Sequence, residues 1–286
     1  MMIMDTNPPA LSASLIISFY NKPETLALVL QSVRNQSAGS FEILIADDGS
    51  SEETVEKLSK LIKDFRFPVR HIWHEDKGWR KNAILNRAAA AASSDYLIFI
   101  DGDCILHKHF VKEHINHRKT GTVLTGRRVY LSPAATSLIL QSGDFRKVYS
   151  LPVVLRLLYD RYADQSSAHL ENALYLGNMF LRKFINRKDR GVLGSNFSLY
   201  RNDLIRINGF DEQYTAPYVG EDTDLEYRLR LAGMQVKTLK HLAIQYHLFH
   251  QRQEKNTLNE EIFKKTKSEG RYYAEKGINQ YLASGS

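Results

Sequence analysis

The first hundred residues alternate short apolar strand patterns with amphipathic helix patterns, and this alternation limits the fold more than any other feature. Strand patterns occupy residues 15–18, 42–46, 69–73 and 96–100, and helix patterns follow the first three strands at about 23–33, 51–65 and 81–92. Asn21 is expected to cap the first helix, and Ser50 or Ser51 the second. Because strands that alternate with helices form a parallel sheet covered on both faces, the sequence predicts an α/β fold with a mostly parallel central sheet.

Polar residues gather where the predicted strands end. The clusters are Ser18 to Asn21, Asp47 with Asp48, and Asp101 with Asp103. Ligands of parallel α/β sheets bind at the carboxyl ends of the strands. We therefore expect these three clusters to form one binding site.

Asp101 and Asp103 follow a buried strand and are separated only by Gly102. Two adjacent carboxylates repel each other unless a cation lies between them. Hard oxygen ligands of this kind suit Mg²⁺ or Mn²⁺, with diphosphate oxygens completing the coordination shell. A polar turn that merely ends the strand is the structural alternative.

Two further segments point to a nucleotide. Asp47 is placed to accept hydrogen bonds from a base edge or a ribose hydroxyl, although the segment also resembles an ordinary turn and helix cap. Arg80 and Lys81 open a helix, where cationic side chains and backbone N–H groups favour an anion such as phosphate. Exposed basic residues on a solvated helix would look the same.

After about residue 130 the pattern changes. Residues 131–190 are basic and amphipathic, with helices predicted at 151–162 and 174–185. Next come a strand at 194–200, a short helix ending at Gly209, a helix from about Glu221 to Gly233, strands at 235–239 and 243–247, and a charged helix over 253–276.

The second half contains its own candidate site residues. Glu221, Asp222 and Asp224 open a helix, where acidic residues favour the helix dipole, but three acids in four positions exceed what capping requires. His247 and His250 follow a strand, and neutral imidazole is a common metal ligand. We favour His247 as the ligand because it lies nearer the strand end. The histidines between His107 and His117 are interpreted as a solvated helix face.

The net charge limits the classes of binding partner that the protein is expected to have. The formal charge of +7 and pI of about 9.3 suit a polyanionic ligand, an anionic membrane surface or a nucleic acid. No helix-turn-helix, zinc-finger or RNA-binding aromatic signature is present, so no nucleic-acid partner is expected. A single cysteine and the lack of a secretory or membrane-spanning segment indicate a soluble cytoplasmic protein, at most peripheral on the cytoplasmic membrane face.

Taken in order, these motifs resemble a known family. Leu15-Ile-Ile-Ser-Phe-Tyr-Asn21, Ile45-Ala-Asp-Asp-Gly-Ser50 and Phe99-Ile-Asp-Gly-Asp103 resemble the amino-terminal half of family 2 glycosyltransferases. Asn196-Phe-Ser-Leu-Tyr200, Asn208-Gly-Phe-Asp211 and Gly220-Glu-Asp-Thr-Asp224 are similar to the acceptor half, and to β-1,4-galactosyltransferases and chondroitin-type polymerases. The resemblance covers roughly residues 14 to 250.

The resemblance implies a GT-A fold, with a Rossmann-like sheet flanked by helices, a helical insertion and a C-terminal helix. It also implies a UDP-sugar donor and Mn²⁺ or Mg²⁺ as cofactor. Asp101, Asp103 and His247 would hold the metal, Asp222 would be the catalytic base, and Asp47 would meet uracil or ribose. Other expected donor contacts are Ser18, Phe19, Tyr20, Arg80, Lys81, Asp101 and Gly102, and Glu221 and His250 are expected near the acceptor. Arg80-Lys81-Asn82 departs from the family's Ala-Arg-Asn.

From the resemblance we expect a metal-dependent inverting glycosyltransferase, either a hexosyltransferase or an N-acetylhexosaminyltransferase, acting in bacterial surface polysaccharide or lipopolysaccharide synthesis. A non-catalytic nucleotide-sugar-binding protein and a glycoside hydrolase are the alternatives. The acceptor would be a saccharide or a lipid-linked sugar. The expected domains are 1–252 for the GT-A unit, made of 14–130, 131–190 and 191–252, and 253–286 for a helical tail. The basic helices of 131–190 would contact an anionic membrane or form an acceptor lid.

Overall fold

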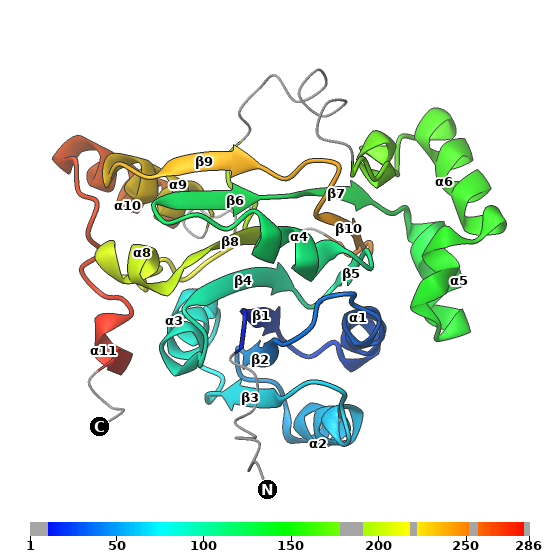
Figure 1. Cartoon of the computed structure of the whole chain (residues 1–286), viewed down its shortest axis with the longest axis horizontal. Helices are drawn as coiled ribbons and strands as arrows, with labels where there is room; N and C mark the ends of the chain where they lie inside the picture. The colour runs from blue at the N-terminus through cyan, green and yellow to red at the C-terminus, as the bar shows by residue number, and fades with distance from the viewer. Residues whose placement is uncertain (1–10, 178–190, 218–221, 252–256, 283–286) are drawn as a thin grey trace, which may run out of the picture.

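The computed structural model describes residues 11–177, 191–217, 222–251 and 257–282. A seven-stranded sheet runs through the centre, in the order β3-β2-β1-β4-β8-β6-β9 (Figure 1). Its strands are β1 (Ser14–Phe19), β2 (Glu42–Asp47), β3 (Val69–Trp73), β4 (Tyr96–Asp101), β6 (Thr122–Thr125), β8 (Asn196–Tyr200) and β9 (Gln235–Thr238). Only β8 runs antiparallel to its neighbours, β4 and β6. The predicted mostly parallel α/β sheet is confirmed.

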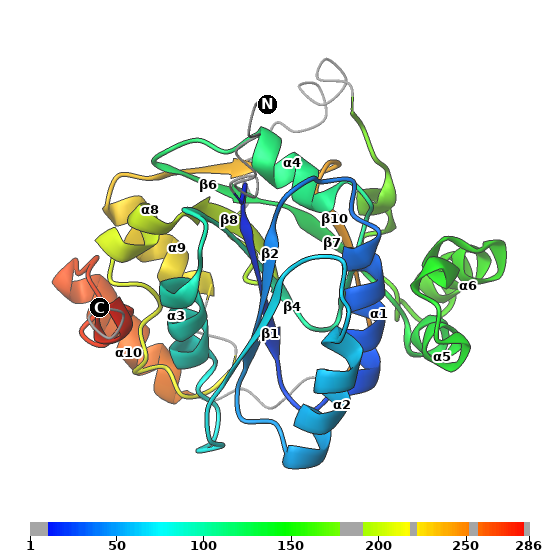
Figure 2. The same cartoon turned by 60° about the horizontal axis from the view of Figure 1, so that its bottom comes forward.

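Apolar strands are buried on both faces because helices cover both sides of the sheet, as Figure 2 shows. On one side lie α1 (Pro23–Arg34) and α2 (Glu52–Ile62), and on the other α3 (Lys81–Ala91), α8 (Arg201–Arg206) and α9 (Asp222–Leu231). Successive strand residues point to opposite faces. Ile17 therefore packs with Leu26 and Val29 of α1, whereas Ile16 packs with Ile84 of α3.

A second, three-stranded sheet continues from the first. It consists of β5 (Cys104–Leu106), β10 (Ile244–His247) and β7 (Arg127–Tyr130), with β10 in the middle. The chain passes from the large sheet to the small one three times, from β4 to β5, from β6 to β7 and from β9 to β10. Gly126 lies at the second crossing, where a Cβ atom would come within 2.4 Å of Ala243 O and 2.3 Å of the Asn196 side chain. The two sheets thus meet too closely there for a side chain.

The start of α1 differs from expectation. Lys22 is its N-cap residue and makes no side-chain cap. Asn21 instead has a positive φ of 48°, and its Oδ1 accepts a hydrogen bond from Ser51 N, so it links the first two strand–helix turns. Ser51 caps α2 by accepting from Thr54 N, as predicted.

The predicted solvated helix at His107 to His117 is wrong. Helix α4 (Phe110–Asn116) packs on the sheet, and His114 is fully buried. The sequence pattern missed this because the buried residues of α4 include the polar Glu113 and His114 beside the apolar Phe110 and Val111. His114 is hydrogen-bonded to Ser198 Oγ at 2.7 Å and to Asn196 Oδ1 at 3.1 Å, which satisfies both of its ring nitrogens.

The region after β7 packs on the small sheet. It contains α5 (Pro133–Ser142), the 3₁₀ helix η1 (Phe145–Tyr149), α6 (Leu151–Ala163) and the 3₁₀ helix η2 (Leu170–Ala173). The helix predicted at 151–162 is confirmed. Of the helix predicted at 174–185, residues 174–177 are not helical and the others lie outside the described residues. Figure 1 shows α5 and α6 standing at one side of the molecule.

The C-terminal segment forms two short helices, α10 (Leu258–Glu269) and α11 (Asn279–Leu282), instead of one. Gly270, with φ of 60°, ends α10. The following residues return to the body, where Ile278 is fully buried and Asn208 Nδ2 donates to Ala274 O. The proposed division at residue 252 stays a prediction. In the described part of the chain, no helix combines the length and apolar character that crossing a bilayer requires.

Candidate active site

A cavity of about 1330 Å³ opens where β1 and β4 end and the small sheet begins. Many of the residues predicted for the site line it together: Ser18, Phe19, Tyr20, Lys81, Asp101, Gly102, Asp103, Asp222, His247 and His250. Asp47 and Arg80 do not line it. Glu221 lies outside the described residues.

Asp101 is held by an ion pair within the protein. Its Oδ1 accepts hydrogen bonds from Ser18 Oγ at 2.7 Å and from Lys81 Nζ at 2.8 Å. Burial raises the pKa of Asp101, but the charge and hydrogen bond of Lys81, with help from Ser18 and Arg128, hold it well below its ordinary value. Asp101 is therefore an anion whose charge is already compensated by a protein cation.

Gly102 is required by a close approach between chain segments. Its N–H donates to Ser18 O at 2.8 Å, and a Cβ atom at this position would lie 2.8 Å from the same oxygen. Its φ is not in the left-handed region, so conformational freedom is not the reason for glycine here. The small residue lets the turn after β4 pack against the end of β1, which sets the direction of Asp103.

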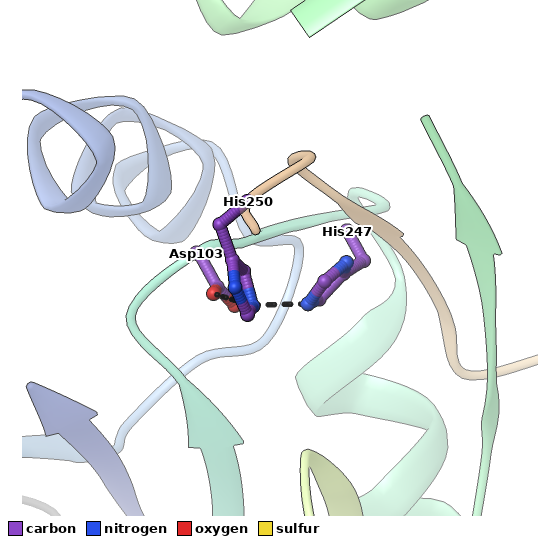
Figure 3. Close-up of side chains that lie close together, drawn as sticks. All are labelled: Asp103, His247 and His250. Atoms are coloured by element: carbon purple, nitrogen blue, oxygen red, sulfur yellow. Dashed lines mark ion pairs between the residues drawn. The ribbon is translucent and has the colours of Figure 1, made fainter. Parts of the chain in front are cut away.

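Asp103, His247 and His250 form a group suited to a metal ion. Each offers a ligand atom, and these atoms all lie within 4.8 Å of one another. Asp103 Oδ1 is 3.7 Å from His247 Nε2, and Oδ2 is 3.3 Å from His250 Nε2. Figure 3 shows both imidazole rings turned toward the carboxylate. The antiparallel pairing of His247 with Cys104 brings the end of β10 beside Asp103.

The donor set fits a divalent cation. Burial lowers the pKa of His247, although the nearby Asp103 carboxylate opposes the shift, so the ring is neutral and able to coordinate at neutral pH. Two imidazoles with one carboxylate suit Mn²⁺ better than Mg²⁺, which prefers oxygen ligands. The predicted metal residues Asp103 and His247 lie together with His250, while the described geometry leaves Asp101 outside this group of three.

Asp47, which was expected to contact uracil or ribose, does not face the cavity. Asp47 is fully buried, with Oδ1 accepting from Ser50 N at 2.8 Å and Oδ2 bonded to His71 Nε2 at 2.9 Å. Because strand side chains alternate, Ala46 and Asp48 line the cavity and Asp47 faces the other side. The turn motif was therefore identified correctly, but the carboxylate at the cavity is the second one.

Asp48 is fixed by two hydrogen bonds. His74 Nε2 lies 2.7 Å from its Oδ1, and the backbone N–H of Arg80 donates to its Oδ2 at 3.0 Å. The Arg80 side chain turns away, donating to Glu75 O and lining a separate cavity of about 750 Å³ beside α3. The Arg80 side chain is therefore not among the lining residues of the large cavity, and Arg80 contributes there only through the backbone N–H that fixes Asp48.

Arg128 was missed by sequence reasoning. It comes from β7 and lines the cavity, with its guanidinium 4.6 Å from the Tyr130 ring centroid and Nη1 donating to Ser195 Oγ at 3.1 Å. Its charge contributes to the lowered pKa values of Asp101 and His247. No motif surrounds Arg128, and only its pairing with β10 brings it to the site.

Asp222 is the first residue of α9 and reaches the cavity from a different element than the metal group. Its Oδ2 accepts a long hydrogen bond of 3.4 Å from Gly194 N. Asp224, two residues later, has a structural role: it is fully buried and pairs with Arg228, Nε to Oδ2, at 2.6 Å. The acidic cluster therefore divides into a cavity residue and a core residue.

Comparisons with known proteins identify the family of the chain. The model of glycosyl transferase family 2 matches residues 14–203, and that of the N-terminal domain of galactosyltransferase matches residues 180–251. Validoxylamine A glucosyltransferase of Streptomyces hygroscopicus is 26% identical over 235 residues, 77% of this chain and 52% of that protein. Hyaluronan synthase of Pasteurella multocida is 24% identical over 79% of this chain and 23% of that protein. The chain thus spans about half or less of the length of these relatives.

Solved structures show the same fold at low identity. GalNAc-T7 with UDP, GalNAc and Mn²⁺ aligns with a TM-score of 0.59 at 12% identity, over 97% of this chain and 54% of that one. The mannosyltransferase PcManGT of Pyrobaculum calidifontis, in complex with GDP-Man and Mn²⁺, aligns with a TM-score of 0.53 at 14% identity, over 86% and 59%.

Proposed function

The chain belongs to glycosyl transferase family 2 and has the GT-A fold, and from this premise we propose that it transfers a sugar from a UDP-sugar to an acceptor hydroxyl with inversion. The observation that carries the proposal is one cavity that combines the Asp103, His247 and His250 group with Asp222. A separate carboxylate and a metal-ligand group are what a direct displacement of a nucleotide diphosphate needs.

We propose that Asp103, His247 and His250 hold Mn²⁺ or Mg²⁺. The ion, when bound, supplies positive charge that stabilises the departing diphosphate. PcManGT and GalNAc-T7 are described in complex with Mn²⁺, which supports this cofactor. The protein adds its own cations, because Lys81 and Arg128 both line the same cavity. Asp101 keeps Lys81 in place there through the 2.8 Å ion pair.

Asp48 and Tyr20 are proposed to contact the nucleoside. Asp48 is held by His74 and the Arg80 backbone, so its carboxylate has a fixed direction, as a group that accepts from a base edge requires. The Tyr20 ring is about half exposed, and its hydroxyl donates to Asp76 Oδ2 at 3.0 Å. A ring fixed at its hydroxyl end can stack on a planar base.

Asp222 is proposed as the general base. It stands at the N-terminal end of the ten-residue helix α9, where the helix dipole favours a negative charge. Among the described residues, only Gly194 N, through its long bond, and Thr223 Oγ1, at 3.3 Å, donate to the carboxylate. It can therefore take the proton from an acceptor hydroxyl as that oxygen attacks the anomeric carbon, and one displacement inverts the configuration.

The acceptor is proposed to be a saccharide or a lipid-linked sugar of a bacterial surface polysaccharide. Relatives in such pathways support this choice, among them the amylovoran biosynthesis glycosyltransferase AmsB of Erwinia amylovora, 26% identical over 83% of this chain. On the acceptor side, Gln165, Ser166 and His169 line the cavity wall. Their hydroxyl, amide and imidazole groups are suited to hydrogen bonds with sugar hydroxyls.

A thermal-shift panel of UDP-sugars with Mn²⁺ or a chelator tests the donor, because a ligand that binds only the folded state raises its stability. The same donors then enter a transfer assay with Asp222→Asn and, as control, with Glu53→Gln, which changes an exposed carboxylate of α2 that does not line the cavity. Asp222→Asn should keep the thermal shift and lose about 10²–10⁴-fold in transfer rate. Normal turnover by Asp222→Asn contradicts the assignment. A wild-type chain that binds UDP without turnover is a sensor, and one that cleaves free oligosaccharide without nucleotide is a hydrolase.

A further inference from the structure

Helix α6 presents apolar side chains on two opposite sides. Val153 and Leu157 are buried against the small sheet, together with Asp160. On the outer side, Leu151 is 68% exposed, Tyr159 64% and Tyr162 86%. The outer side of a helix on a globular protein ordinarily carries polar residues. The apolar outer side of α6 therefore requires an explanation.

The exposed residues form one continuous stripe. Leu151, Leu155, Leu158 and Tyr162 are spaced by four, three and four residues, which places them on one line along a helix. Val154 and Tyr159 widen the stripe on either side. At 100° per residue its centre lies on the side of the helix axis opposite Val153 and Leu157. We call these six residues the outer face of α6.

Cations border this face, and the helix exposes no carboxylate between Leu151 and Ala163, although its C-cap residue Asp164 is exposed just beyond the stripe. Arg161 lies along one edge of the stripe and Arg156 along the other. The only acidic residue between Leu151 and Ala163 is Asp160, which is fully buried and bonded to Ser132 and Arg156. The preceding 3₁₀ helix adds Lys147 and the half-exposed Tyr149. The excess of Arg161 and Lys147 over Asp164 favours a partner that is apolar and anionic.

We infer that the outer face of α6 docks on the surface of an anionic lipid bilayer. Leucines enter the acyl boundary, tyrosines suit the headgroup level, and arginines reach the lipid phosphates. The helix, about 20 Å long, lies parallel to the surface. A second copy of the chain fits less well, because two such faces would bring together more arginines than the single exposed carboxylate at the end of each helix, Asp164, can pair with.

The docking surface is continuous with the proposed active site. Gln165, Ser166, Ala168 and His169, immediately after α6, line the large cavity. Ala168 also pairs with Tyr130, which ties this segment to β7 and the small sheet. If the proposed transfer is correct, docking brings the cavity wall to the surface in which a lipid-linked acceptor is anchored. The docking itself depends only on the outer face.

The experiment is co-sedimentation of the full chain with vesicles of phosphatidylcholine alone or mixed with phosphatidylglycerol. Binding is expected to the mixed vesicles, and to weaken with salt. The double variant Leu155→Glu/Tyr162→Glu should bind about 100-fold more weakly, because two large apolar contacts are lost. Leu258→Glu changes a half-exposed leucine on α10 in the same way and should bind like wild type. Arg161→Gln should weaken binding to the vesicles that contain phosphatidylglycerol and leave any binding to phosphatidylcholine alone unchanged.

Thermal unfolding separates docking from folding, since exposed side chains can change without loss of the core. Equal binding to both vesicle types, or equal binding by wild type and the double variant, overturns the inference. So does a lipid-free dimer that the double variant converts to a monomer, since the face would then belong to a second copy. Transfer to a water-soluble acceptor should be unchanged in the double variant, so failure of docking and failure of the proposed transfer are distinguishable.

Discussion

Lowering the pH from 7 to 5 should destabilise this fold through one buried histidine. His114 on α4 is fully buried between Asn196 and Ser198 of β8, and burial lowers its pKa to about 3. Both hydrogen bonds are compatible with a neutral ring, in which one nitrogen donates to Asn196 Oδ1 and the other accepts from the Ser198 hydroxyl.

The sign and size follow from proton linkage. Below its ordinary pKa of 6.5, His114 binds a proton in the unfolded chain but not in the folded one until the pH nears 3. The unfolded state therefore binds more protons, and stability falls as the pH falls. At about 1.36 kcal/mol per pH unit, the loss at pH 5 is about 2 kcal/mol.

Urea unfolding at pH 7 and pH 5 measures this loss in wild type and in His114→Gln. Glutamine offers a donor and an acceptor but does not titrate. The variant should be less stable at pH 7, yet lose about 2 kcal/mol less than wild type on acidification. His107, whose pKa burial lowers to about 4, titrates in both proteins and cancels in the comparison. If both proteins lose the same free energy between these pH values, the account of His114 is refuted.

Three further predictions concern the site and the core. Gly102→Ala should reduce the transfer rate at least about tenfold in steady-state assays, because its Cβ atom would lie 2.8 Å from Ser18 O. Asp103→Asn should abolish Mn²⁺ binding in calorimetric titration, whereas Asp101→Asn should weaken it only about 10–100-fold, the effect typical of residues that support a ligand. Arg228→Leu should cost about 3–5 kcal/mol in urea unfolding, since it leaves a buried aspartate without its cation.

The strands of the first half could be predicted because their physical signal is local. In β1 the three consecutive residues Leu15, Ile16 and Ile17 are all apolar. Because their side chains point to both faces of the sheet, such a run is stable only between two helix layers. The positions of the acidic clusters follow from the same fact, since they are the first polar residues after each buried run. The fold class and the general location of the site could therefore be predicted without knowing which distant segments are in contact.

Side-chain direction could not be predicted, because it depends on contacts between distant segments. Asp47 and Asp48 point to opposite sides at the end of β2, but only contacts with distant segments, such as the bond from His71 of the neighbouring strand to Asp47, show which side is the cavity. Asp101 was expected to bind metal, but Lys81, twenty residues earlier in the chain, already compensates its charge. Arg128 carries no local signal, since a charged residue in a short strand is usually exposed.

The site is assembled from two sheets, and this explains why its parts are so scattered in the sequence. The ends of β1 and β4 in the large sheet supply the proposed donor contacts, whereas the start of β5 and the end of β10 bring the metal group from the small sheet. Asn196 joins the two sheets, because its Nδ2 donates to Ala243 O just before β10 and its Oδ1 accepts from Gly126 N at the crossing into β7. His114 bonds the same Oδ1. The residues that hold the sheets together thus also set the distance between the proposed metal and donor contacts. A change in packing at this junction is therefore expected to change the geometry of the site.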